Sequence, residues 1–340
     1  MAPSLKQSLL LRSCYLYYKE QRNIKDIAEQ LGISRFRVSR FLTEAIETGV
    51  VQVQFLDPSM QTERMALELG SAYGLRRVLI APTPENADIE SKRQAVGRLG
   101  AELLSDLSSD AVIGITWGRT VAHMVESFAP NGAKVSQVVE LAGGFGQISS
   151  SVAARVVALR LAEKLNAECI QVVAPIIADT PQSAAMLLAE SSIVRALDLA
   201  EKADIAVVGV GPASLDSLLY RSSYLTEKDF ERLATVNAVG SVIGRFYDIT
   251  GAPVVADPWD RVVGLTLERF CRIPERIAVA AGPFKIESIV GLARGHLITT
   301  LVTDSETASA LMAYHLAHEG AGGAAAAPAA KKRKTPRGTQ

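Results

Sequence analysis

Short apolar runs that alternate with helical stretches constrain the fold of this chain more than any other feature of its 340 residues. From residue 76 onward most of these runs are rich in β-branched residues and end in Gly or Pro: RRVLIAP, DAVIGITWG, KVSQVVELAGG, ECIQVVAP, ADIAVVGVG and RIAVAAG. Helical patterns occupy residues 91–107 and 150–166, and residues 296–316 add a last strand and helix. Because such strands must be covered on both faces, the pattern predicts an α/β fold with a Rossmann-like parallel sheet.

Residues 24–43, IKDIAEQLGISRFRVSRFLT, predict a helix-turn-helix ahead of this sheet. The motif needs a small residue where its helices cross, a turn residue that tolerates positive φ, and an apolar anchor in the second helix. Ala28, Gly32 and Val38 meet these needs at spacings of four and six residues. Ser34 is placed as the N-cap of the second helix. The spacing therefore predicts a DNA-binding module.

The exposed start of the second helix is the predicted contact surface for double-stranded operator DNA. In this motif the recognition helix enters the major groove with its N-terminus first. The side chains expected to reach bases and phosphates are Ser34, Arg35, Phe36, Arg37, Ser39, Arg40 and Thr43. The alternative is an ordinary helical hairpin with a solvated basic face.

Charge and pattern divide the chain into four segments. The first 55 residues hold eight Lys/Arg and five Asp/Glu, the last ten hold five basic residues and no acid, and the rest holds 23 basic and 31 acidic residues. Basic ends on an acidic body indicate that nucleic acid meets the ends. The predicted segments are a winged-helix-like DNA-binding domain with a strand at 50–56 (1–56), a connecting helix (57–75), the α/β domain (76–318) and a disordered basic tail (319–340).

Composition argues against several classes of protein. No run reaches 18 uncharged apolar residues, so we expect no membrane-spanning segment. The start, MAPSLKQSLLLRS, lacks the pattern of a secretory signal. Three scattered cysteines fit reduced thiols, and the four histidines lack partners at metal-ligand spacing. We therefore expect a cytoplasmic protein with no membrane partner, no metal site and no cofactor.

The stretch GITWGRT (114–120) is the first candidate for a ligand-binding loop. A strand is expected to end near Ile115 and a helix to begin near Thr120. Backbone N–H groups and hydroxyls at such a junction favour an anionic or polyhydroxylated ligand. The candidate residues are Thr116, Gly118, Arg119 and Thr120. A tight strand-to-helix turn without a ligand is the alternative.

Further strand ends are expected to converge on the same crevice, as they do in open parallel sheets. LAGGFG contributes Gly143 and Gly144, and GVGPAS contributes Gly211. Lys285 follows another strand in AGPFK, where an ammonium meets a phosphate or carboxylate, although a solvated surface lysine is the alternative. In TDSETA, Asp304 and Thr307 are equally well explained as a helix cap.

Taken in order, these motifs resemble the SorC (SorC/DeoR) family of bacterial sugar-responsive transcriptional regulators. The resemblance covers about residues 8–316 and is most specific in IAEQLGISRFRVSRFL, GITWGRT, AVGSVIGRFYDITG, AGPFK and LVTDSETA. It implies an effector-binding and oligomerisation domain similar to sugar-phosphate isomerases and glucosamine-6-phosphate deaminase. It also implies a sugar, polyol or phosphosugar effector, dimers or tetramers, and allosteric control of a carbohydrate or polyol operon.

By this resemblance the effector lies over the GITWGRT loop, with Gly143 and Gly144 opposite, and the loop around Gly240 and Lys285 closes the pocket. The chain departs from the family pattern at two places. Ser241 stands where the family commonly has Asp, and AGPFK replaces a GGxxK pattern. Asp248 is a nearby alternative acceptor, or part of a turn. The effector of any one relative therefore does not carry over.

An active isomerase or deaminase joined to a DNA-binding module is the main alternative. Isomerisation needs a base beside the carbonyl and commonly an acid. The enzymes that the domain resembles use paired acids in a DGADE-type loop and a lysine before a glycine run, whereas here Ala142 precedes Gly143 and that loop has no paired acids. We therefore expect no enzymatic activity. A ligand-independent architectural DNA-binder is the third alternative, and the pocket-forming loops argue against it.

Overall fold

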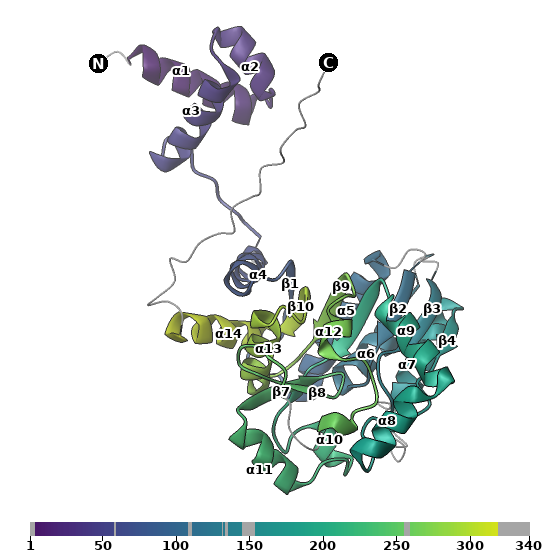
Figure 1. Cartoon of the computed structure of the whole chain (residues 1–340). Helices are drawn as coiled ribbons and strands as arrows, with labels where there is room; N and C mark the ends of the chain where they lie inside the picture. Colours follow the sequence, from purple (N-terminus) through teal and green to yellow (C-terminus); the bar gives the residue numbers. More distant parts are fainter. Residues whose placement is uncertain are drawn as a thin grey trace, which may run out of the picture. The chain divides into compact units, whose positions relative to one another are not determined.

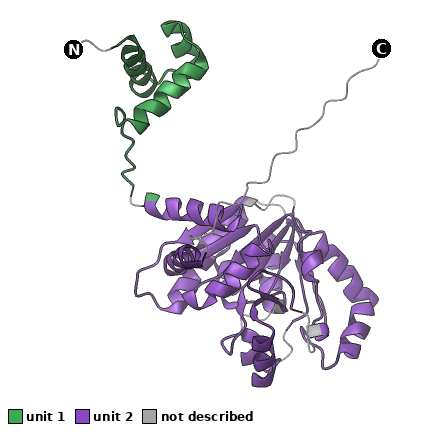
Figure 2. Cartoon of the chain, turned by 60° about the vertical axis from the view of Figure 1, so that its left-hand side comes forward, with its two compact units in different colours: residues 1–60 green, residues 61–340 purple. Residues whose placement is uncertain are grey.

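The computed structural model describes residues 4–57, 59–107, 111–130, 132, 135–144, 154–254 and 259–318. It divides the chain into two compact units, Met1–Met60 and Gln61–Gln340 (Figure 2). The basic tail predicted at 319–340 lies outside the described residues. Within the described part of the chain, no helix is both long and apolar enough to cross a membrane.

Unit 1 is a small helical module. Its elements are α1 (Leu5–Cys14), a π-helical turn (Tyr15–Lys19), α2 (Ile24–Leu31) and α3 (Arg35–Glu47). The three α-helices enclose a core that includes Ile27, Ala28, Val38 and Phe41, all buried. The residues predicted to cross and anchor the helix-turn-helix thus lie in one core.

Local capping explains why α2 stops and α3 starts at once. Asn23 caps α2 by accepting a hydrogen bond from the N–H of Asp26 at 2.9 Å. Gly32 ends α2 in the left-handed conformation, with φ of 64°, which glycine adopts without strain. The Ser34 hydroxyl then accepts from the N–H of Arg37 at 3.2 Å and caps α3. The predicted turn and cap are both confirmed.

The strand predicted at 50–56 is not formed. Residues 52–57 carry no regular secondary structure, and Val53 and Phe55 are about half or more exposed. A strand needs a partner for its backbone groups, and the described residues of unit 1 contain no other strand. Alternation of apolar and polar residues was therefore a misleading signal in this segment.

Unit 2 is built on a seven-stranded sheet in the order β1-β10-β9-β5-β2-β3-β4, in which every neighbouring pair is parallel. The strands are β1 (Arg77–Ala81), β2 (Ala111–Ile115), β3 (Val135–Glu140), β4 (Glu168–Ile170), β5 (Ile205–Gly209), β9 (Glu275–Val279) and β10 (Thr300–Asp304). Each coincides, to within one residue, with an apolar run that the sequence predicts as a strand, so the predicted α/β parallel-sheet fold is confirmed.

Helices cover both faces of this sheet (Figure 1). The helices of unit 2 are α4 (Met60–Tyr73), α5 (Ile89–Leu107), α6 (Arg119–Ser127), α7 (Ala154–Leu165), α8 (Pro181–Ala189), α9 (Ser191–Glu201), α10 (Leu218–Arg221), α11 (Glu227–Thr235), α12 (Leu267–Phe270), α13 (Ile286–Arg294) and α14 (Ser305–His318), with 3-10 turns at Trp259–Arg261 and Pro283–Lys285; α10 and α11 pack with the small sheet described below. Alternate residues along a strand pack against the helices on opposite faces of the sheet, as β5 shows. Ile205 and Val207 pack with α5, α6 and α7, whereas Ala206 and Val208 pack with α9, α13 and α14.

A second, antiparallel sheet of three short strands was not predicted. It consists of β6 (Gly211–Pro212), β7 (Ala238–Val242) and β8 (Arg245–Asp248), in that order. Gly211 pairs with Ser241, which brings the GVGPAS and AVGSV motifs together. This small sheet therefore carries four of the predicted ligand-binding positions, Gly211, Gly240, Ser241 and Asp248.

The connections from the large sheet reverse direction between β2 and β5. After β2 the chain continues outward to β3 and β4, whereas from β5 it continues the other way to β9 and β10. In open parallel sheets the crevice at such a reversal, beyond the carboxyl ends of the strands, is where ligands bind. The topology thus points to residues that follow Ile115 and Gly209.

Candidate functional site

A pocket lies at the carboxyl ends of β2 and β5, where the sheet topology places it. Thr116, directly after β2, accepts a hydrogen bond at its Oγ1 from the N–H of Gly209, 3.3 Å away at the end of β5. Gly118 follows with φ of 144°, a conformation that side-chain-bearing residues rarely adopt. The loop can therefore turn at once into α6.

The first turn of α6 faces the pocket without a side-chain cap. Its N-cap is Gly118, which makes no side-chain hydrogen bond to the helix, and Arg119 and Thr120 are its first two residues. The N–H groups at a helix start are not used by the helix itself, and together with the helix dipole they attract anions. The backbone here is suited to an anionic ligand.

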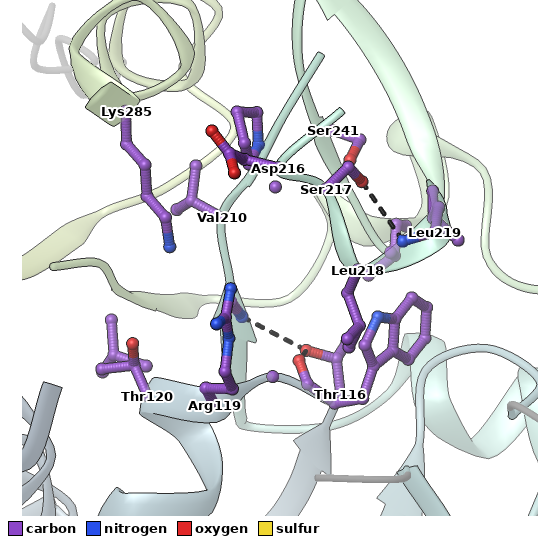
Figure 3. Close-up of a pocket in the computed structure, with 18 of the residues that line it drawn as sticks. Thr116, Arg119, Thr120, Val210, Asp216, Ser217, Leu218, Leu219, Ser241 and Lys285 are labelled. Carbon is purple, nitrogen blue, oxygen red and sulfur yellow. Dashed lines mark hydrogen bonds between the residues drawn. The ribbon is translucent and has the colours of Figure 1, made fainter. Parts of the chain in front are cut away.

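The opposite wall comes from the small sheet and from the segment before α13. Gly211 packs closely against Ser241, since a Cβ on Gly211 would lie 2.7 Å from Ser241 Oγ. Lys285 ends the 3-10 turn Pro283–Lys285, and its side chain is directed into the pocket (Figure 3). Asp304 supports this turn by accepting a hydrogen bond from the N–H of Gly282 at 2.9 Å.

Three cationic side chains meet at this pocket: Arg93, Arg119 and Lys285. Lys285 is 9% exposed, its ammonium lies 5.7 Å from the centroid of the Phe284 ring, and no described carboxylate or carbonyl pairs with it. Burial first, and then the charges of Arg93 and Arg119, lower its pKa from 10.5 to about 7, while Asp304 raises it. Burial and the neighbouring arginines Arg93 and Arg221 also lower the pKa of Arg119. Excess positive charge is thus gathered in one partly buried place.

An ion pair with Glu90 holds Arg93 in this cluster. It is 6% exposed, and its guanidinium donates to Glu90, with 3.0 Å between Nη1 and Oε2. The other oxygen of Glu90 lies 2.5 Å from Nε2 of His123 on α6. One carboxylate therefore links the start of α5 to α6 and fixes Arg93 at the pocket.

Seven residues predicted from the sequence line the pocket. They are Thr116, Gly118, Arg119, Thr120, Gly211, Ser241 and Lys285. They come from four separate parts of the sequence, and the fold brings them together around one space. Lys285 is buried, so the alternative of a solvated surface lysine is excluded.

Four other predicted residues do not line the pocket. Gly143 and Gly144 are held by backbone hydrogen bonds with Val263 and Ala174, and a Cβ on Gly143 would lie 2.6 Å from the Ala174 carbonyl. These two glycines therefore allow neighbouring backbone segments to approach closely.

The other two have packing and turn roles. A Cβ on Gly240 would lie 2.6 Å from Tyr247 Oη, so this glycine allows close packing behind the small sheet. The Asp248 carboxylate accepts hydrogen bonds from Thr250 and Ala252 within its own turn. Asp248 is therefore not positioned to replace the acid missing at Ser241, and the turn interpretation of FYDITG is correct.

Two lining residues with obvious chemistry were missed. Arg93 lies in a helix whose polar face looks ordinary in the sequence, and Asp216 lies in the loop after β6. No motif marks either position, because the folding of α5 and of the small sheet against β2 is what brings them to the pocket. Within the described residues, no group of three or more His, Cys, Asp and Glu side chains is placed to hold a metal ion.

In unit 1, every residue predicted to contact DNA is exposed. Phe36 is the extreme case, since 79% of its surface is accessible although it is aromatic. No described acidic side chain pairs with Arg35 or Arg40. The outer surface of α3 therefore presents free guanidinium groups and an exposed aromatic ring.

Comparison with known proteins agrees with these two units. Residues 58–313 match the Sugar-bind family model, a sugar-binding domain. The deoxyribonucleoside regulator of Bacillus subtilis (strain 168) is 32% identical over 311 residues, which are 90% of this chain and 98% of that protein. The transcriptional regulator LsrR of Enterobacter sp. (strain 638) is 26% identical over 314 residues, covering 91% and 94%.

A solved structure is similar over both units. The full-length sorbitol operon regulator SorC from Klebsiella pneumoniae has a TM-score of 0.70 and 26% identity, covering 92% of this chain and 100% of that one. These relatives are named as regulators and not as isomerases or deaminases. These names support a regulator rather than an isomerase or deaminase. The chain belongs to the SorC family of transcriptional regulators, and residues 58–313 are its sugar-binding domain.

Proposed function

We propose that this regulator is controlled by a phosphorylated sugar or polyol bound at the β2–β5 pocket. One observation carries the proposal. Lys285 carries a buried ammonium that pairs with no described carboxylate or carbonyl, and it faces a pocket that Arg93, Arg119 and the start of α6 also face. A buried charge without a partner is costly, and a phosphate monoester supplies both the opposite charge and several acceptor oxygens.

The relatives support the sugar part of this proposal. One relative is named a deoxyribonucleoside regulator and another a sorbitol operon regulator. The first name refers to a compound that contains a pentose, and the second to a polyol. Hydroxyls at Thr116, Ser217 and Ser241 line the same pocket as the cations. A ligand with one phosphate and several hydroxyls uses both kinds of group.

Operator DNA is bound by α3 in this proposal, through the seven exposed residues from Ser34 to Thr43. Two or more copies of the chain, as a dimer or tetramer, place their recognition helices in successive major grooves of a roughly palindromic operator. The regulator acts in the cytoplasm. We assign DNA binding to residues 1–56, the connection to 57–75, and effector binding and oligomerisation to 76–318.

Effector and operator are coupled through a change in the arrangement of subunits. An effector that binds one arrangement more tightly shifts the population toward it and changes operator affinity. By linkage, operator DNA changes effector affinity by the same factor.

A thermal-shift screen of the full-length protein tests the ligand class. The panel pairs each compound with its phosphate: deoxyribose and deoxyribose 5-phosphate, sorbitol and sorbitol 6-phosphate, glucose and glucose 6-phosphate. A ligand that binds only the folded state raises the melting temperature by mass action. We expect a rise with at least one phosphate and a much smaller rise with its unphosphorylated partner.

Two variants assign the site. Lys285→Met should abolish the shift, because it removes the buried ammonium and keeps an unbranched side chain. Lys202→Met, which removes an exposed lysine at the end of α9, should leave the shift unchanged. Shifts with unphosphorylated compounds alone, or a Lys285→Met variant that binds the phosphate normally, would refute the proposed phosphate site.

A further inference from the structure

The loop between β6 and α10 gives the pocket an acidic side. Residues 213–217 form this loop, and Asp216 and Ser217 both line the pocket. Asp216 is the one acidic side chain among the described residues that line it. In Figure 3 its carboxylate and the side chains of Lys285 and Arg119 border the same space. The charge of this carboxylate is opposite to that of the three cations.

The backbone of this loop is fixed, whereas the carboxylate is only lightly held. Ser217 N–H donates to the Ser214 carbonyl at 2.9 Å, and the Ser217 hydroxyl caps α10 by accepting from Leu219 N–H. The Asp216 carboxylate has one ion pair, 3.0 Å from Nη2 of Arg221, and both side chains are more than half exposed. Exposed pairs of this kind contribute little free energy. Asp216 can therefore exchange Arg221 for a ligand at low cost.

A carboxylate is a poor neighbour for phosphate and a good one for hydroxyls. Ionised carboxylates only accept hydrogen bonds, and they accept them more strongly than neutral groups do. The other side chains that bear polar atoms around this pocket are cations, hydroxyls and the Trp117 indole. Among the described lining side chains, Asp216 is thus the strong acceptor available to sugar hydroxyls.

We propose that Asp216 is the specificity-determining residue of this pocket, accepting hydrogen bonds from ligand hydroxyls while the cationic cluster holds the phosphate. The ligand class is then a polyhydroxylated phosphate monoester, and a phosphate without hydroxyls binds without using Asp216. This inference rests on the proposed function, since it needs the phosphate to lie at Arg93, Arg119 and Lys285.

The test compares two probes by titration calorimetry on the full-length protein. One probe is the sugar phosphate from the panel above that gives the largest thermal shift, and the other is methyl phosphate, which has no carbon-bound hydroxyl. Asp216→Asn keeps the shape of the side chain and removes its charge. We expect Asp216→Asn to weaken binding of the sugar phosphate by about 10- to 100-fold, because charge-assisted hydrogen bonds are lost. The affinity for methyl phosphate should stay equal or increase slightly.

Asp198→Asn is the matched control. Asp198 lies on α9, is 56% exposed at its side chain compared with 62% for Asp216, and also pairs with an arginine, Arg269. It should change neither affinity. If Asp216→Asn weakens both probes equally, or weakens neither, the specificity role is wrong while phosphate binding by wild-type protein still supports the proposed function. If wild-type protein binds neither probe, both proposals fail together.

Discussion

At the scale of single residues, Lys285 shows how a ligand site conflicts with stability. Its ammonium is buried beside two arginines, so the folded protein disfavours the charged form and its pKa falls from 10.5 to about 7. The unfolded chain keeps the ordinary value. Between these two values the unfolded state binds more protons than the folded state, so stability increases as the pH rises from about 7 toward 10.5. Below pH 7 the full cost of the buried charge is present.

Lys285→Met should therefore stabilise the ligand-free protein, and most strongly at acidic pH. The gain in unfolding free energy should be largest below pH 7, where the folded wild type carries the buried charge, and should shrink as the pH approaches 10.5. Urea unfolding at pH 6 and pH 9 measures the difference. The exposed variant Lys202→Met should show no such trend. A gain that is equal at both pH values would show that the ammonium is not what destabilises the native state.

Single residues also show what the sequence could and could not predict about the site. The loop 116–120 was predictable because an apolar run ends near Ile115 and a helical pattern begins a few residues later, so the chain turns at Gly118, which is a local property. Lys285 was predictable because it directly follows the end of another apolar strand, which is also a local property. Arg93 and Asp216 were not, because their neighbours in the sequence have no unusual pattern and only the packing of α5 and the small sheet brings them to the pocket.

At the scale of elements, the close packing of α5 on α6 positions much of the cationic cluster. A Cβ on Gly97 would lie 2.7 Å from His123 Cβ and 2.8 Å from the backbone of α6, so these helices touch without a side chain between them. Arg93 is one turn away on α5, and Arg119 begins α6. The distance between the two helices therefore sets the distance between two of the pocket's cations.

Gly97→Ala should push these helices apart. We expect a loss of about 1–3 kcal/mol in stability, as overpacking of a tight interface costs, together with weaker binding of the sugar phosphate. Denaturant unfolding and calorimetry measure the two effects. Gly70→Ala in α4 is the comparison, because its nearest contact would be 3.4 Å and helical alanine is favoured over glycine by about 0.5–1 kcal/mol. Equal effects of both variants would contradict the packing argument.

Elements differ in how well the sequence predicts them. Most strands of the large sheet were predictable because they are largely buried and read as short apolar runs, although the edge strand β4 is only partly buried. β6 is only two residues long and exists because Gly211 pairs with Ser241, which no local pattern reveals. Residues 50–56 show the reverse case, where a strand-like alternation lacks a partner. Pairing partners, rather than propensity, decide the outcome for such short segments.

At the scale of the whole molecule, the proposed function assigns operator binding to unit 1 and effector binding to unit 2. Unit 1 presents unpaired arginines on α3, and unit 2 contains the pocket. The family assignment covers both units, since the full-length SorC structure matches 92% of this chain. Substitutions in one unit should therefore change one binding reaction directly and affect the other only through coupling.

Arg35→Ala and Arg40→Ala should each weaken operator binding by about 1–3 kcal/mol if the arginine reads a base, or lower the slope of log affinity against log salt by about one if it binds a phosphate. The sugar phosphate affinity of the free protein should not change. Operator affinity is measured by fluorescence anisotropy on a duplex that the wild type selects from a random pool. Sugar phosphate affinity is measured by calorimetry. Lys228→Ala on α11 is the control in unit 2. Normal DNA binding by both arginine variants would exclude α3 as the recognition helix.

The pairing of β1 with β10 has a consequence for how such regulators evolve. These are the first and last strands of the large sheet, and they lie side by side, as do α4 and α14, where Tyr73 Oη donates to the Leu311 carbonyl at 2.9 Å (Figure 1). The pocket is built on other strands, β2 and β5. On the proposed assignment of DNA binding to unit 1, we expect gene fusion at the start of α4 to exchange the output module and to leave the ligand pocket of unit 2 intact, so that unit 2 can be recombined with other modules.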